Sequence, residues 1–289
     1  MEDLIDELKV EIETIGNRNL EEDGLYKITV AAALVKSYEF MKLCANHDAD
    51  SKVYFTLGSL RGICEEYIVL SFLKDLAPEE RDKAIGATMS LKVQESLKRQ
   101  KLFFDNERSF QPIIQPNNKN EELIEKYKQD LKDIGERTGA WSKKTSMPKI
   151  HSMAEALSLG DFYKYFYTLS SETVHFNPRI LLRMGWSEKD DMENFQFSTD
   201  NFSNYYKEYG RVYSALLFIR FGFKFKTLLG LSSEFKDVAM KLEEKLKDIL
   251  RWPEPVTFEE MNKEGPKGFV RIMYKVTAES SNKQSKADV

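Results

Sequence analysis

Cysteine and histidine are scarce in this sequence of 289 residues, which has two cysteines, Cys44 and Cys64, and three histidines. Two thiols are too few for a disulfide framework or for a thiolate zinc site. Cys44 and His47 lie close together, but no second pair of ligands is near them in the sequence. We therefore expect no metal site and no cofactor.

Motifs that name a reaction are also missing. The sequence has no glycine-rich phosphate loop, no Gly-x-Ser-x-Gly nucleophile elbow and no His-Glu-x-x-His helix. The sequence alone therefore does not identify a reaction, and whether the protein is an enzyme stays open.

Long apolar runs are absent as well. The most apolar stretch, residues 212–231, is interrupted by Arg220, Lys224 and Lys226, which would place three charges in the hydrocarbon of a bilayer. The first four residues lack the basic start and the apolar run of a secretory signal. We expect a cytoplasmic protein without a membrane partner.

Neither sign of charge is in large excess. The sequence has 43 lysines and arginines against 47 acidic residues, a formal net charge of −4. This balance argues against a surface coated in positive potential for non-specific nucleic-acid binding, but it allows a local basic patch.

The sequence does have strong helical periodicity. Leu4, Leu8, Ile12 and Ile15 recur every three or four positions and form one apolar face. Similar spacing continues along most of the chain, and 42% of the residues are hydrophobic, which is ample for a sizeable core. The sequence predicts an all-α fold, a multi-helix bundle with a short extended C-terminal segment.

We expect three parts and no internal repeat. Residues 1–24 form an N-terminal helix, residues 25–250 the main helical domain, and residues 251–289 a C-terminal extension. Within the extension, Phe269–Val276 resembles a short strand, and the polar tail after it is expected to be disordered.

One polar face stands out in the main domain. Tyr163, Tyr167, Ser171 and His175 recur every four residues, so they share one side of a helix. In a functional interpretation, His175 transfers protons or contacts an anion while the Tyr167 and Ser171 hydroxyls orient the ligand. In a structural interpretation, the same groups only satisfy hydrogen bonds between packed helices.

Pro178 predicts that this helix ends close to His175. Proline lacks an amide donor and would clash with the carbonyl four residues earlier if the helix continued. The residue before a proline is pushed out of the helical region, so Asn177 is well placed to cap a new turn that begins at Pro178. We expect His175 to lie within one turn of a helix end.

Arg61 and Glu65 lie one turn apart on an earlier, otherwise apolar helix of residues 50–75. Such a pair is often an exposed salt bridge, but its apolar surroundings indicate partial burial and therefore a polar partner elsewhere. His175, Asn177 or Arg179 could supply that partner and form a site from two distant segments. An internal ion pair that fixes helix register is the structural alternative.

A basic run lies between Arg137 and His151, and it contains Trp141, Lys143 and Lys144 but no acidic residue. Basic side chains beside an indole suit phosphate contact and base stacking, so these three residues are candidate ligand contacts. A flexible, solvated loop is the alternative, and the run gains interest only if it borders His175.

The Arg61-x-x-x-Glu65 helix and the later Tyr163-to-His175 helix resemble a bacterial helical family of unknown function, with Trp141-Ser142 and Met153-Ala154-Glu155 adding to the likeness. The resemblance covers roughly residues 25–230. It implies an all-helical fold and a shared site at Arg61, Glu65, Ser171 and His175, with no established activity.

A remoter likeness is to the HEPN superfamily, many of whose members are metal-independent ribonucleases in toxin and phage-defence systems. Those enzymes have four to six residues between an arginine and the histidine that follows it. This sequence departs from the pattern, because Thr168, Leu169 and Ser170 occupy the corresponding positions before His175. Arg61 can complete the pair only through space.

Three functions remain open. The first is binding of a ligand or macromolecular partner at Arg61, Glu65 and His175. The second is RNA cleavage, with His175 as general acid or base and Arg61 or Arg179 stabilising the phosphorane, which makes RNA a candidate partner. The third is a structural module that forms homo-oligomers through the aromatic helix expected at Phe202–Leu229.

Overall fold

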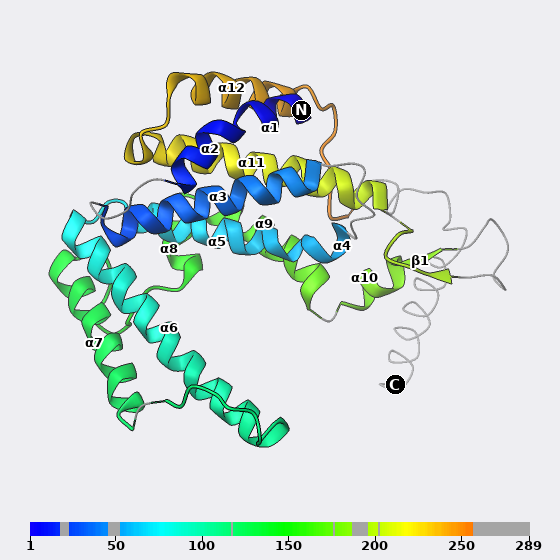
Figure 1. Ribbon diagram of the computed structural model, residues 1–289. Coiled ribbons are helices and arrows are strands. Elements are labelled where there is room, and N and C mark those ends of the chain that lie inside the picture. Colours follow the sequence, from blue (N-terminus) through cyan, green and yellow to red (C-terminus); the bar gives the residue numbers. More distant parts are fainter. Residues whose placement is uncertain are drawn as a thin grey trace, which may run out of the picture.

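The computed structural model confirms the all-α prediction (Figure 1). It describes residues 1–17, 23–45, 53–116, 118–175, 177–186, 196–201 and 203–256. No helix in these ranges is both long and apolar enough to cross a membrane. The strand-like run Phe269–Val276 and the tail after it lie outside the described residues.

The helices and the two short strands follow one another along the chain. Their bounds are α1 (Glu2–Glu7), α2 (Lys9–Gly16), α3 (Leu25–Ala45), α4 (Val53–Thr56), α5 (Gly58–Leu73), α6 (Pro78–Glu107), α7 (Asn120–Thr138), α8 (Ile150–Ala156), α9 (Gly160–Val174), α10 (Pro178–Arg183), β1 (Gly185–Trp186), β2 (Gln196–Phe197), α11 (Ser203–Leu229) and α12 (Ser233–Lys247). Strands β1 and β2 form a small antiparallel pair in which Gly185 lies opposite Phe197.

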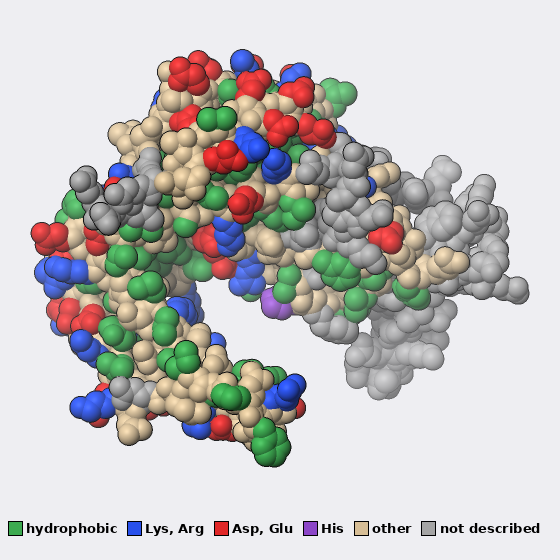
Figure 2. Space-filling model, viewed as in Figure 1, with side chains coloured by type: hydrophobic (Ala, Val, Ile, Leu, Met, Phe, Trp, Pro, Cys, Tyr) green, Lys and Arg blue, Asp and Glu red, His purple; other side chains and the backbone are tan. Residues whose placement is uncertain are grey.

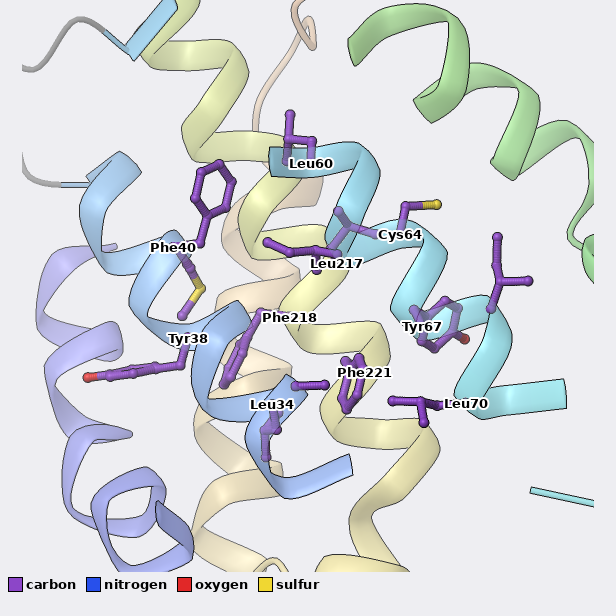
Figure 3. Packing of buried hydrophobic residues seen from close by; sticks show 14 of the residues in the cluster. Leu34, Tyr38, Phe40, Leu60, Cys64, Tyr67, Leu70, Leu217, Phe218 and Phe221 are labelled. Atoms are coloured by element: carbon purple, nitrogen blue, oxygen red, sulfur yellow. The ribbon is translucent and has the colours of Figure 1, made fainter. Parts of the chain in front are cut away.

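Helix α11 lies at the centre of the core. It packs against α3, α4, α5 and α12, and Figure 3 shows its Leu217, Phe218 and Phe221 side chains among those of α3 and α5. Phe218 is fully buried between the rings of Tyr38 and Phe235, at centroid distances of 5.8 and 5.9 Å. Six of the eight aromatic residues of α11 are buried in this core, and a homo-oligomer that forms through the helix stays a prediction.

The N-terminal helices cover α3 and α12. Glu11 on α2 accepts hydrogen bonds from the backbone amide of Ser232, at 2.6 Å, and from its hydroxyl, at 2.7 Å. The same Ser232 hydroxyl caps α12 by accepting from the amide of Phe235 at 3.0 Å. One serine thus starts α12 and ties it to α2.

Helices α6 and α7 form an arm that extends away from the other helices (Figure 1). Buried residues on α7 pack against α6, and Arg137 holds the carboxylate of Glu80 with two hydrogen bonds of 3.1 and 2.6 Å. After α7, the chain turns at Gly139, which has a φ of 70°. The indole of Trp141 then packs on Gly135 and lies 6.2 Å from the Phe72 ring at the end of α5.

Replacing Phe218 by alanine tests the central packing of α11. Phe218→Ala removes a fully buried ring and leaves a cavity, so it should lower the free energy of unfolding by about 3–5 kcal/mol. Phe55→Ala, at a position that is 66% exposed, serves as the control and should cost much less. Urea unfolding of both variants measures the difference, and equal losses would contradict a core centred on α11.

A pair of helical glycines tests the position of Trp141. A Cβ on Gly135 would lie 2.3 Å from the indole Nε1, so Gly135→Ala should destabilise by about 1–3 kcal/mol. A Cβ on Gly62 of α5 would meet nothing closer than Lys36 Nζ, at 4.0 Å, so Gly62→Ala should stabilise by about 0.5–1 kcal/mol. Thermal and urea unfolding measure the change in the free energy of unfolding of each variant, which should be opposite in sign. Equal stability of the two variants would contradict the packing of Trp141 on Gly135.

Candidate functional site

Helix α5 places Arg61 and Glu65 at its partly exposed edge. The helix packs against α9, α8, α11 and α3, and this packing fixes its position. Arg61 Nε donates a hydrogen bond of 2.8 Å to Glu65 Oε1. The two side chains are 30% and 24% exposed, so the pair is half-buried, as its apolar surroundings predict.

Helix α9 and its C-terminal end supply the residues that contact Arg61 and Glu65. The Arg61 guanidinium lies over the ring of Tyr167, 4.3 Å from its centroid, and Nη1 lies 3.5 Å from Nε2 of His175. Tyr163, one turn before Tyr167, donates its hydroxyl to Glu65 Oε1 at 3.5 Å. The prediction that Arg61, Glu65 and His175 form one cluster is therefore confirmed, and we call these five residues the Arg61 cluster.

The charges in the Arg61 cluster are well defined. The hydrogen bond with Glu65 raises the pKa of the Arg61 guanidinium, which stays protonated. Burial, and then the charge of Glu65, raise the pKa of the Tyr163 hydroxyl, which therefore remains a hydrogen-bond donor. Glu65 thus accepts from both neighbours and holds the guanidinium in one orientation.

Ser171 lies between Tyr167 and His175 on the same face of α9. Arg61 touches the residues one turn before and one turn after it, so Ser171 faces α5. Its Oγ is buried and has no hydrogen-bond partner among the described residues. Buried hydroxyls normally have a partner, so Ser171 is an exception among the described residues, but its Oγ does not reach the surface of the cluster.

The end of α9 exposes the imidazole. The helix ends at Val174, and His175 has extended backbone with its amide bonded to the Ser171 carbonyl at 2.9 Å. Pro178 begins α10, and the Asn177 side chain accepts from the amide of Arg179 at 3.1 Å. The predicted helix break and the predicted Asn177 cap are both confirmed.

Arg179 has a contact that the sequence did not predict. Its Nη1 and Nη2 donate to the carbonyl of Pro255 at 3.3 Å each. Because backbone carbonyls carry no sequence signal, this tie between α10 and the segment after α12 appears only in the structure.

The candidate contacts of the basic run, Trp141, Lys143 and Lys144, lie at the other end of α5. Trp141 is only 8% exposed, so its ring is not available for base stacking, which corrects the interpretation of Trp141 as a ligand contact. Lys143 is paired with Glu136 at 2.9 Å, and the exposed Lys144 follows in the same loop. Trp141 marks the Phe72 end of α5, roughly 16 Å along the helix from Arg61. His151, the last residue of the run, does border the Arg61 cluster, because its ring lies 6.4 Å from that of Tyr163.

A shallow groove of about 460 Å³ next to the cluster escaped the sequence analysis. It lies between α3, α5 and the start of α6, and Glu65 belongs to both the groove and the cluster. Its lining residues are Thr29, Ala32, Ala33, Lys36, Gly62, Glu65, Glu66, Val69, Leu70 and Ile85. Small side chains on facing helices were the one sequence signal for it.

Figure 2 shows that the molecule is hollowed between the arm and the other helices. A histidine and several lysine and arginine side chains gather along the edge of this hollow, opposite the arm. Within the described ranges, no group of three histidine, cysteine or acidic side chains is placed to hold a metal ion.

The two thiols are not candidates for nucleophilic chemistry. Burial raises the pKa of Cys44 and of Cys64 to about 12, so both stay protonated near neutral pH. A thiol, unlike a thiolate, is a poor nucleophile. The Arg61 cluster, with its permanent cation and its imidazole, is the chemically most capable group of side chains in the described part of the chain.

Comparison with known proteins supports a family and no activity. A family model described as Family of unknown function (DUF5677) matches residues 27–194, which include the whole Arg61 cluster. No curated protein and no solved structure matches the chain. The likeness to HEPN proteins gains no support from these comparisons. Because the match covers more than half of the sequence, the chain belongs to this family of unknown function.

Proposed function

We propose that this protein binds a phosphate-bearing ligand at the Arg61 cluster. The proposal is supported by the way in which the Arg61 guanidinium is fixed. Its Nε donates to Glu65 and one of its faces lies over the Tyr167 ring, while the Arg61 side chain remains 30% exposed. A guanidinium fixed in this way presents its remaining N–H groups in the fork geometry that suits phosphate oxygens.

The neighbouring groups favour an anion over a cation. Among the acidic side chains near the cluster, Glu65 is already bonded to Arg61, and Glu66 is paired with Lys36 across the groove. His175 adds a second donor when its ring is protonated or when Nε2 carries the proton.

The ring of Tyr167 favours a ligand larger than inorganic phosphate. Tyr167 is 41% exposed beside the guanidinium. A nucleotide could place its phosphate on Arg61 and its base or sugar against this ring, since aromatic side chains stack on any base. Nucleotides and single-stranded RNA therefore share the chemistry that the cluster offers.

Substitution of Arg61 tests phosphate binding directly. Arg61→Ala should weaken the binding of pyrophosphate or a mononucleotide about tenfold or more, because a hydrogen bond to a charged group contributes about 1.5–3 kcal/mol. Calorimetric titration of the wild type and the variant measures this change.

Arg220 provides the matched control. It is exposed, and its guanidinium lies 4.4 Å from the ring centroid of Phe162, which closely resembles the position of Arg61 over Tyr167. No carboxylate or histidine contact is seen for it in the described structure, so Arg220→Ala should leave binding unchanged. Equal effects of the two substitutions, or no binding of either probe by the wild type, would remove the proposal.

A second candidate function is cleavage of RNA without a metal ion. It is favoured by the 3.5 Å contact between Arg61 Nη1 and His175 Nε2, which brings an arginine to the histidine through space. In such a reaction the 2′-hydroxyl loses its proton and attacks the phosphorus, and the 5′-oxygen leaves and gains a proton. His175 would transfer one of these protons, and Arg61 would stabilise the charge on the phosphorane.

The two candidates predict different behaviour of His175→Ala. Loss of a general acid or base should lower the rate of cleavage by about 10²–10⁴-fold while RNA affinity stays nearly constant. A pure binding role predicts weaker association and no cleavage in any variant. The measurement is cleavage of varied labelled RNAs in the presence of a chelator, with 5′-hydroxyl and cyclic phosphate ends as the expected products.

His151→Ala serves as the control for this experiment. His151 is the other histidine among the described residues; it lies on α8, where its exposed ring is 3.7 Å from the Glu155 carboxylate and borders the cluster with its centroid 6.4 Å from that of Tyr163. Cleavage that survives in a folded His175→Ala protein would exclude His175 as the catalytic residue, and a wild type that cuts none of the RNAs would leave only the binding function.

A further inference from the structure

The Arg61 cluster is part of a longer line of contact between α5 and α9, which we call the α5–α9 seam. At one end of the seam, the Tyr163 hydroxyl donates to Glu65. At the other end, Val174 packs directly on Gly58, since a Cβ on this glycine would lie only 2.6 Å from Cγ2 of Val174. The two helices therefore run antiparallel, and the seam continues from the Arg61 cluster toward the start of α5.

Helix α4 places an aromatic ring just beyond this end of the seam. Tyr54 is buried, with its ring 5.2 Å from that of Tyr206 on α11, so the position of α4 is fixed. The next side chain, Phe55, is 66% exposed. It lies three residues before Gly58, and Leu57 between them keeps helical backbone angles, so Phe55 and Gly58 share one side of the chain. The Phe55 ring is therefore an open aromatic surface at the end of the seam.

Exposed aromatic rings thus lie on both sides of the Arg61 guanidinium. Tyr167 is 41% exposed and supports the guanidinium, and Phe55 lies beyond Val174 in the other direction along the seam. In Figure 2, hydrophobic side chains lie beside the histidine that is visible at the edge of the hollow. Tyr167 and Val174 are seven residues apart on α9, which corresponds to roughly 10 Å along a helix. One base is too small to contact Tyr167 and Phe55 together, so the two rings suit two different bases.

We infer that the phosphate-bearing ligand is a single strand of nucleic acid that follows the α5–α9 seam. A backbone phosphate binds Arg61 and His175. One base stacks on Tyr167, and the base of another nucleotide stacks on Phe55. This inference rests on the proposed function, since it assigns a phosphate to the Arg61 cluster.

The order of the side chains along the seam favours a single strand over a duplex. A cation with an aromatic ring on each side suits a single strand, because its phosphates need a positive partner and its bases are free to stack on side chains. A duplex keeps its bases paired and stacked on one another, so it offers no base to Tyr167 or Phe55.

The length of the ligand tests the inference. Stacking of one base on an aromatic ring strengthens binding about 5- to 150-fold, so a uridine hexanucleotide should bind at least about fivefold tighter than uridine monophosphate. Calorimetric titration with the full chain measures both affinities. The hexanucleotides are a 2′-O-methyl strand, which has no free 2′-hydroxyl to attack the phosphorus, and a 2′-deoxy strand, and their comparison shows which sugar the seam prefers.

Substitution of Phe55 shows whether the second ring carries this gain. Phe55→Ala should weaken the binding of the hexanucleotides at least about fivefold and leave the affinities for uridine monophosphate and pyrophosphate unchanged. Phe55→Trp, which keeps an aromatic surface, should retain tight binding. Phe103→Ala removes a ring of similar exposure, 58%, from α6, so it is the matched control and should change none of the affinities.

Two results would overturn the inference and leave the phosphate site standing, with pyrophosphate binding that still depends on Arg61. One is a hexanucleotide that binds no tighter than uridine monophosphate, and the other is equal loss of hexanucleotide affinity in Phe55→Ala and Phe103→Ala. Absence of binding for pyrophosphate, uridine monophosphate and both hexanucleotides would contradict the phosphate site and the inference together.

Discussion

Burial of α11 is the constraint on which the rest of the structure depends. Its buried apolar residues have no single face, because Tyr209 and Val212 lie on one side of the helix and Phe218 and Phe225 lie on the opposite side. A helix with buried apolar residues on opposite sides must be covered by several neighbouring helices. The helices α3, α5, α12 and α4 supply this cover.

The Arg61 cluster follows from this arrangement. α5 packs on α11 with one face and on α9 with another, which leaves a narrow edge of α5 between buried and exposed environments. Arg61 and Glu65 lie on that edge, where a charge keeps some water and still has a fixed partner. The packing of α5 on α11 and α9 therefore sets the position of the guanidinium. Changes in the core would shift the Arg61 cluster even where its own residues are unchanged.

Much of this could be predicted from the sequence, for physical reasons. Pro178 dictates the break of α9 through its missing amide, and the four-residue spacing of Tyr163, Tyr167 and His175 dictates their common face. A charged pair in an apolar helix needs a polar partner, which led to the association of Arg61 with His175. The helix break and the common face follow from local backbone geometry, and the need for a partner follows from the cost of burying a charge.

Other features depend on contacts between distant segments. The composition of the loop around Trp141 resembles that of a nucleic-acid contact. In the folded protein, however, the indole is buried against Gly135 and near Phe72, and these residues are distant from each other in the sequence. The aromatic residues of α11 are compatible with an interface or with a core, and the sequence does not say which helices will cover them. The groove beside Glu65 is formed by three helices, and its small side chains predict a groove only once the helices that face one another are known.

The carbonyls of Pro253 and Glu254 accept hydrogen bonds from Tyr213 and Tyr205, and these bonds, with those from Arg179 to Pro255, have a mechanical consequence. A force applied to the chain beyond Val256 acts first on the Arg179 bonds and then on the hydroxyls of Tyr205 and Tyr213, which are rooted in the centre of the protein. These bonds lie between the point of pulling and α12, so they protect that helix from being peeled away. Burial raises the pKa of the Tyr213 hydroxyl, which keeps its proton, and so the anchorage, even in alkaline solution.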